Sequence, residues 1–301
     1  MSDATITPGG TMLRMTAANG TLRAVAAVTT GVVEEARRRH GTYPTATAAL
    51  GRTLTAGLLL GAHMKDEERL SIELAGDGPL RRVMATTTGS GQVRGYVARP
   101  ATHLPSKNGK LDVAGAVGNG LLCVIRTQPW NKEPYRSIMN IVSGEIGQDI
   151  AHYLLTSEQI PSAVALGVFV NREGDVGAAG GYVVQLLSGG AETTISQVEA
   201  NIAALPPVTT LVREGRGPAE ILDAVLAGLD RTTIDEAPVR FACPCTRERV
   251  FGALLLLGRA ELEDMIATEG RAEVTCEFCA ERYVIDRGEL TTLAAEPQGS
   301  A

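Results

Sequence analysis

Aromatic residues and long apolar runs are both scarce in this chain. Only 4% of its 301 residues are aromatic, and Trp130 is the single tryptophan. A protein that binds single-stranded nucleic acid stacks bases on clustered aromatic side chains, which this composition does not supply. No stretch approaches the roughly 18 apolar residues that a membrane-spanning helix needs. We therefore expect neither a base-stacking surface nor a membrane partner.

An excess of positive charge and an export signal are missing as well. The net charge of −6 and the pI of about 5.4 disfavour a polyanionic partner such as nucleic acid. Residues 1–9 contain neither a basic start nor an apolar run, so no signal peptide is expected. These features predict a cytoplasmic protein in which thiols stay reduced.

The pattern of apolar residues predicts an α+β core domain over residues 1–190. With 44% hydrophobic residues, the chain is long enough for a large core and for two domains. Turn-linked stretches of alternating apolar residues indicate an antiparallel sheet, and apolar residues spaced three or four apart indicate helices packed on it. A glycine-rich turn is expected at residues 174–181. Helices are expected at residues 30–40, 44–63 and 143–155, the last capped by Ser143, and strands at 70–74, 81–87, 92–98, 121–127, 135–142, 164–170 and 182–187.

The pattern changes over residues 191–235, which we interpret as a helical linker. Thr194 and Gln197 have the spacing of a capping box, and Pro218 begins a second helix. Helices this short are marginal alone, so each must pack its apolar face on another surface. The apolar residues expected to be buried are Ile195, Val198, Ile202 and Leu205 in the first helix and Ile221, Leu222, Val225, Leu226 and Leu229 in the second.

Four of the five cysteines form two tight clusters near the C-terminus. Cys243-Pro244-Cys245 is followed, after thirty residues, by Cys276-Glu277-Phe278-Cys279. A C-x-C and a C-x-x-C on short turns can supply four thiolates to one tetrahedral zinc ion. Because four sulfur ligands leave no position for water, the spacing predicts a structural or redox site and not a hydrolytic one. The four histidines, at positions 40, 63, 103 and 152, all lie outside this region, so a four-thiolate set is the economical assignment.

The clusters lie in a predicted small zinc-binding domain at residues 236–290. Between the clusters lie residues 249–257, then Gly258, then residues 261–267 with Leu262, Met265 and Ile266 expected to face inward. Residues 273–275 and 282–285 are expected to form a hairpin. Between residues 238 and 288 we count seven arginines and no lysines against nine acidic residues, which disfavours phosphate binding. Residues 291–301 are expected to be a polar tail that frays.

A metal ion shared by the clusters would link residues 245 and 276 across the intervening loop. Zinc contributes on the order of 10–16 kcal/mol to the folding of small zinc modules, and a domain this small has little core without such a link. An oxidant that paired the cysteines within each cluster would leave two very short loops, which constrain an unfolded chain least. We infer that the oxidised domain would unfold and expose the apolar faces of the linker helices.

Spacing alone leaves other functions open. The cysteines could form a permanent structural clip, or a zinc ribbon that contacts nucleic acid or ribosomes. An enzyme with an unrecognised pocket in the core is a further alternative, although no carboxylate pair and no nucleophile with a base partner stands out. The fifth cysteine, Cys123, lies in the apolar run 121–125 and is expected to be a buried, unreactive thiol.

The cysteine spacing and a core segment together resemble the heat-shock protein 33 family, the redox-regulated holdases also called 33 kDa chaperonins. The core segment comprises Ile141–Ile146, Asp149–Leu154 and Ser157–Ser162, followed by the apolar strand at 164–170. The resemblance covers residues 10–290, and none of the four clustered cysteines departs from the family's pattern.

The resemblance implies an ATP-independent chaperone of the bacterial cytosol and not an enzyme. While reduced, it would be an inactive monomer holding one zinc ion on Cys243, Cys245, Cys276 and Cys279. Oxidation would release zinc, form the disulfides Cys243–Cys245 and Cys276–Cys279, and unfold the linker and zinc domain. The oxidised homodimer would then hold unfolding client proteins during oxidative stress. No nucleic acid or membrane partner is implied.

Overall fold

The computed structural model describes residues 9–187 and 189–295. The chain divides into two compact units between Ala242 and Cys243. We call residues 1–242 the core unit and residues 243–301 the C-terminal unit. Among the described residues, no helix combines the length and the apolar character that crossing a membrane requires.

The core unit is built on one large sheet, with ten strands in the part of the chain that the structure describes. Their order is β7-β6-β3-β4-β5-β10-β1-β2-β9-β8. Neighbours are antiparallel except β5 and β10, which meet in parallel only at Gln92–Arg240 and Val93–Phe241. The strands are β1 (Gly10–Ala17), β2 (Leu22–Val28), β3 (Arg69–Gly76), β4 (Arg82–Thr88), β5 (Gln92–Val97), β6 (Gly120–Thr127), β7 (Tyr135–Asn140), β8 (Ser162–Val170), β9 (Val176–Leu186) and β10 (Arg231–Phe241). The predicted α+β class with an antiparallel-dominated sheet is confirmed.

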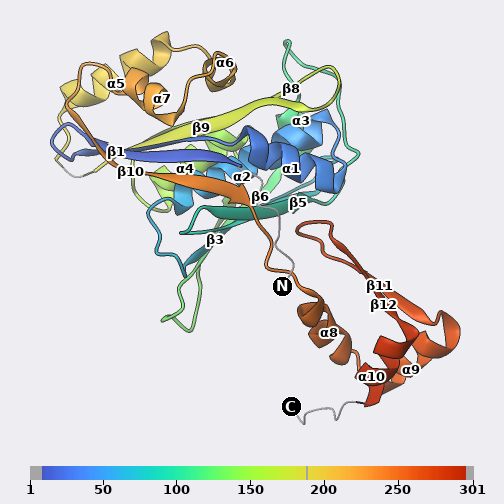
Figure 1. The fold of residues 1–301 in the computed structure, drawn as a ribbon. Helices are drawn as coiled ribbons and strands as arrows, with labels where there is room; N and C mark the ends of the chain where they lie inside the picture. Colours follow the sequence, from blue (N-terminus) through green and yellow to red (C-terminus); the bar gives the residue numbers. More distant parts are fainter. Residues whose placement is uncertain (1–8, 188, 296–301) are drawn as a thin grey trace. The chain divides into compact units, whose positions relative to one another are not determined.

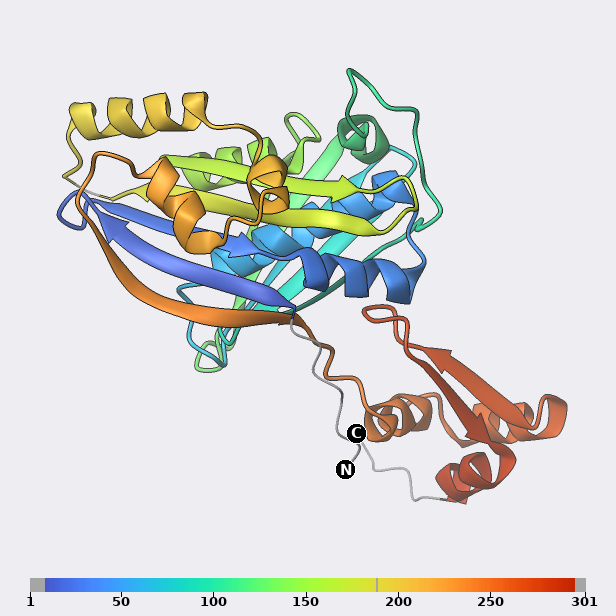
Figure 2. The same ribbon diagram turned by 45° about the horizontal axis from the view of Figure 1, so that its top comes forward.

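Helix α2 (Pro44–Gly61) lies between the two halves of this sheet (Figures 1 and 2). Leu50, Leu54 and Leu58 are fully buried, as their spacing of four predicts. The helix packs closely on β4, since a Cβ on Gly61 would come within 2.7 Å of the Thr87 side chain. Glycine at this position therefore allows the helix to pack closely on the sheet.

Three other helices complete this side of the core unit. Helix α1 (Thr30–His40) ends as predicted at Gly41, which adopts the left-handed conformation with φ of +60°. The others are α3 (Val113–Val117) and α4 (Ile146–Thr156). Together with α2 they bury the largest apolar cluster of the described residues against the sheet.

The helices of the predicted linker cover the opposite face of β1, β2 and β9 (Figure 2). They are α5 (Glu192–Ala204), α6 (Val208–Arg213) and α7 (Pro218–Val225). In α7 and just after it, Ile221, Leu222, Val225 and Leu226 are fully buried, whereas α5 buries only Val198. Helix α7 is therefore held by packing far more firmly than α5.

The C-terminal unit has a small core of its own. Its elements are α8 (Arg247–Leu255), α9 (Arg259–Thr268), β11 (Arg271–Thr275), β12 (Arg282–Asp286) and α10 (Arg287–Ala295). Strands β11 and β12 form the predicted antiparallel hairpin. Leu262, Ile285 and Leu290 are fully buried at the centre of this core.

Two predicted helix starts are wrong. Helix α4 begins at Ile146 after Glu145, because the Asp149 carboxylate accepts the Val142 and Ser143 amides and holds this segment outside the helix. Ser143 instead accepts the Glu145 amide through Oγ, at 3.0 Å.

The second wrong start is that of α5. This helix already begins at Glu192, with Ala191 as its N-cap and no side-chain cap, so Thr194 and Gln197 form no capping box. Helix α6, which the sequence analysis did not predict, follows the Pro206-Pro207 pair.

The glycine-rich segment 174–181 is a turn only at its start, which corrects the prediction. Strand β9 already begins at Val176, so Gly180 and Gly181 lie inside it. A Cβ on either glycine would come within 2.7 Å of a carbonyl oxygen of a neighbouring strand. These glycines therefore serve close strand packing.

Two segments near the C-terminus also differ from expectation. Strand β10 spans the expected boundary between linker and zinc domain at residue 235, since it pairs with β1 from Arg231 to Val239. Residues 291–295 belong to α10, where Leu293 and Ala294 are buried against the small core, so this part of the expected polar tail is helical. The rest of that tail, residues 296–301, lies outside the described residues.

Candidate metal centre

The first cysteine turn lies between β10 and α8. Cys243 and Cys245 flank Pro244, and the next residue, Thr246, caps α8 by accepting the Arg249 amide through Oγ1 at 3.3 Å. An N-cap of this kind fixes where the helix begins. The turn that carries both sulfurs is thus set directly against a capped helix end.

The second cysteine turn closes the β11–β12 hairpin. The Cys276 amide donates to the Glu281 carbonyl at 2.9 Å, and the Ala280 amide donates to the Cys276 carbonyl at 2.8 Å. Ala280 adopts φ of +56°, a left-handed conformation that is uncommon outside glycine and asparagine. The chain thereby folds back sharply enough to place Cys276 and Cys279 on one side of the turn.

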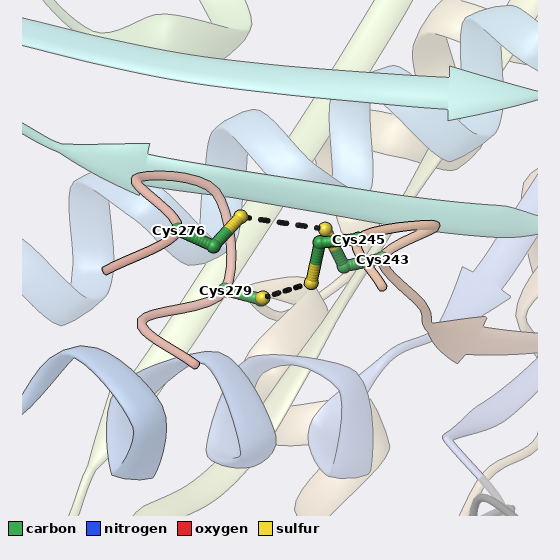
Figure 3. A group of neighbouring side chains, drawn as sticks. All are labelled: Cys243, Cys245, Cys276 and Cys279. Atoms are coloured by element: carbon green, nitrogen blue, oxygen red, sulfur yellow. Dashed lines mark hydrogen bonds between the residues drawn. The ribbon is translucent and has the colours of Figure 1, made fainter. Parts of the chain in front are cut away.

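The two turns bring all four sulfurs together. Every Sγ lies within 4.8 Å of the other three. The Sγ atoms of Cys243 and Cys276 are 3.8 Å apart, and those of Cys245 and Cys279 are 3.2 Å apart (Figure 3). Four sulfurs placed about 2.3 Å from a central zinc ion would be separated by about 3.8 Å. The cluster therefore has the size and the donor set of a tetrahedral thiolate site, and none of the four cysteines is in a disulfide.

The surroundings of the sulfurs raise the cost of forming thiolates without a cation. Hydrogen bonding to Cys243 and burial raise the pKa of Cys279, which is only 2% exposed. Burial also raises the pKa of Cys245, against the opposing effect of a hydrogen bond from Tyr283. A bound dication reverses this balance because it stabilises the deprotonated sulfurs. Ionised sulfurs in this cluster thus need a positive partner.

Two neighbouring contacts support the cluster. The hydroxyl of Tyr283, on β12, donates to Sγ of Cys245 at 3.2 Å. Arg247, at the start of α8, donates through Nε and Nη2 to the carboxylate of Glu289 at 3.1 and 2.6 Å. Its Nη2 also donates to the Val284 carbonyl at 2.7 Å. These contacts join the element that carries the first turn to the hairpin that carries the second.

The four clustered cysteines were predicted from their spacing, whereas Tyr283 and Arg247 were not. Tyr283 lies four residues after Cys279, inside a predicted strand. The only feature of the sequence that could have suggested its role is a hydroxyl group that needs a hydrogen-bond partner. Cys123 does not join the cluster and is half-buried, which corrects the expected burial. Its neighbours Leu122 and Val124 face the core, so Cys123 faces the other side of β6. Burial and the nearby Glu73 raise the pKa of its thiol.

Comparison with known proteins identifies the family. A family model described as "Hsp33 protein" matches residues 10–286. The "33 kDa chaperonin" of Desulforamulus reducens is 46% identical over 280 residues, covering 93% of this chain and 95% of that protein. The chain belongs to the Hsp33 family. The "33 kDa chaperonin" of Bacillus subtilis is 43% identical over 284 residues and covers 94% of this chain and 97% of its own length.

A solved Hsp33 structure supports the fold. The crystal structure of the 33 kDa chaperonin from Thermotoga maritima superimposes with a TM-score of 0.89 at 38% sequence identity. The match covers 95% of this chain and 98% of that chain. The resemblance inferred from the cysteine spacing and the core segment is thereby confirmed at the level of the family and the fold.

Proposed function

We propose that this chain is a redox-regulated, ATP-independent holdase chaperone of the cytoplasm, inactive while its cysteines are reduced and bound to zinc. The observation that carries the proposal is the meeting of four cysteine sulfurs, all within 4.8 Å of one another, from two turns far apart in the sequence. Membership of the Hsp33 family, whose relatives are named chaperonins, supports the chaperone role.

Cys243, Cys245, Cys276 and Cys279 would hold one zinc ion per chain. Bound there, the ion supplies a cross-link between the two turns and stabilises four thiolates. A zinc ion bound to all four sulfurs would have no open coordination position for water, which agrees with a role other than hydrolysis. Tyr283 and the Arg247–Glu289 pair orient the two turns for this purpose.

Oxidation would convert each turn into a disulfide. One thiolate attacks a peroxide oxygen and becomes a sulfenic acid while hydroxide leaves. The neighbouring thiol attacks that sulfur, forms the S–S bond and releases the sulfenic oxygen as water. Each disulfide consumes one peroxide, which takes two electrons. The pairs we propose are Cys243–Cys245 and Cys276–Cys279, both of which abolish the link between the turns.

Two close approaches in the reduced cluster run between the turns. Cys245 and Cys279 are 3.2 Å apart, so a disulfide between them is a geometric alternative. Such a bond would preserve the long-range link and keep the C-terminal unit folded. Mapping of the disulfides therefore distinguishes two outcomes. Disulfides within the turns would let the C-terminal unit unfold, whereas a disulfide between the turns would keep it folded.

Unfolding of the C-terminal unit would reach the linker through β10. This strand lies between α7 and Cys243 in the chain, and pairs with β1 from Arg231 to Val239. If β10 loosens, α7 loses part of its support and the apolar residues around Leu226 become available to unfolding clients. We propose that the residues 191–235 act as the sensor, and that the oxidised form is a homodimer while the reduced form is a monomer.

The test uses the full-length, zinc-loaded, reduced protein. Peroxide at raised temperature should release one zinc ion per chain, followed with a colorimetric chelator, in step with suppressed aggregation of a denatured client. Peptide mapping should find both disulfides within the turns. Retention of zinc, without protection of the client, would instead indicate a permanent structural zinc module.

A further inference from the structure

A cavity of about 220 Å³ lies in the core unit at the C-terminal end of α2. Its walls come from β2 and β9, from β3 and β6, from α4 and from the residues that follow α2. Leu59, Ile160 and Val183 contribute to the apolar part of the wall. Sites for small ligands combine an apolar wall with a few converging polar groups. This cavity has that composition.

Two arginines enter the cavity from different strands. Arg23, on β2, donates through Nε and Nη2 to Oε1 of Gln185 at 3.0 and 2.7 Å, so its bonded partner is neutral. The Nε atom of Arg126, on β6, is buried without a hydrogen-bond partner among the described residues. Burial and the charge of Arg126 lower the pKa of Arg23. Two cations thus converge on a sheltered space, and neither bonds a carboxylate in the described part of the chain.

His63 adds a second unsatisfied polar atom to the cavity. Its Nε2 atom is also buried without a partner in the described residues. Burial and the nearby Arg23 and Arg14 lower the pKa of this imidazole to about 4, so it is neutral at neutral pH. Buried polar atoms almost always have partners in folded proteins. Unsatisfied atoms on two different elements, facing one cavity, point to a ligand that completes them.

The acidic residues of the cavity narrow the class of ligand. Glu158 accepts a hydrogen bond from the Tyr153 hydroxyl, and Glu68 is 8% exposed. Two carboxylates near two guanidiniums would repel a multiply charged anion such as phosphate. A monocarboxylate carries one negative charge and is repelled less, and guanidinium groups bind carboxylates through paired N–H donors.

We propose that this cavity binds a small organic monocarboxylate. Arg126 and Arg23 would hold the carboxylate, and the hydrocarbon part would pack on the apolar wall near Leu59 and Val183. The site lies wholly within the core unit and uses none of the four clustered cysteines. It therefore stands or falls independently of the redox switch.

The experiment titrates the full-length, reduced protein with butanoate, hexanoate and inorganic phosphate. Ligand-detected NMR and the unfolding temperature of the core unit report binding. Hexanoate should bind and raise the unfolding temperature with concentration, whereas phosphate at equal ionic strength should not. The substitution Arg126→Met should weaken hexanoate binding at least about tenfold, because a charge-assisted bond pair is lost.

Two further variants keep the test decisive. Arg136→Met, on the exposed face of the adjacent strand β7, is the matched control and should bind hexanoate normally. Arg23→Gln should also weaken binding, and it serves if Arg126→Met does not fold. Absence of carboxylate binding, a preference for phosphate, or unchanged binding by both cavity variants overturns the proposal. So does a crystal soaked in hexanoate whose cavity contains only ordered water.

Discussion

The core unit and the C-terminal unit achieve a fixed structure by different means. In the core unit, α2 lies inside a sheet that covers it from two sides, and side chains such as Leu54 and Ile72 are fully buried. In the C-terminal unit the described core comprises eight buried residues, and four thiols converge from turns 33 residues apart. Burial can stabilise the first unit alone, whereas the second needs a cross-link.

Removal of one sulfur should produce the largest difference in stability between the two units. Cys279→Ser replaces the most buried member of the cluster and should abolish stoichiometric zinc binding. The C-terminal unit should lose on the order of 10 kcal/mol of metal-linked folding free energy and unfold. Zinc analysis together with NMR spectra measures both effects. Cys123→Ser, outside the cluster, is the control and should retain zinc. If the resonances of the C-terminal unit stay intact without zinc, this unit does not need the metal cross-link, and the comparison between the two units fails.

Charge introduced under the linker helices should affect the core unit next most strongly. Leu226→Asp places a carboxylate at a fully buried position and should cost at least the roughly 2–5 kcal/mol of a buried Leu→Ala change. The reduced variant should then suppress aggregation of a denatured client without oxidant while keeping its zinc. Ile202→Asp, at a half-buried position on α5, should give a smaller effect. If both variants stay inactive and fully folded, the linker is not the sensor.

The Arg14–Asp235 pair should contribute a smaller, pH-dependent effect. Asp235 lies on β10, and its hydrogen bond with Arg14 lowers its pKa below the ordinary value of 3.8. A depressed carboxyl pKa contributes stability that is present above the unfolded pKa and is lost as the pH falls through the folded pKa.

Because both side chains are partly exposed, Asp235→Asn should destabilise the core unit by at most about 1 kcal/mol at pH 7. The difference from wild type should shrink below about pH 4. Denaturant unfolding across that range measures it. A difference that persists unchanged at low pH would show that the pair acts by packing and not by charge.

Loss of one hydroxyl beside the cluster should have the smallest effect. Tyr283→Phe removes the donor to Cys245 Sγ and leaves the ring in place. In the zinc-loaded protein the sulfur is already ionised, so loss of this hydrogen bond does not change its protonation but makes the thiolate more nucleophilic, and it should react faster with peroxide. We expect zinc release to quicken a few-fold, with zinc stoichiometry unchanged before oxidation. Equal release rates would show that this bond does not govern the reactivity of the cluster.

Much of the architecture follows from residue patterns alone. The spacing of Leu50, Leu54 and Leu58 located α2, and the two cysteine motifs located the site, because periodicity and ligand chemistry are local properties. Positions decided by distant contacts could not be predicted. Asp149 moves the start of α4, and the glycines of β9 serve neighbouring strands.

The same limit applies at the site. The hydrogen bond from Tyr283 to Cys245 depends on how β12 lies against the first turn. This arrangement cannot be read from the linear sequence. Strand β10 was not predicted, because the strand that pairs with it, β1, is more than 200 residues away in the sequence. The position of such a strand is decided by its partner and not by its own pattern.

Regional hydrogen exchange of the oxidised, zinc-free protein is the most direct test of the central claim. After peroxide treatment, amides of residues 243–295 should exchange within seconds and those of α7 and β10 should lose protection, while α2 stays protected. Slow exchange throughout the C-terminal unit in the fully oxidised protein, equal to that of the reduced and zinc-bound form, would contradict the account.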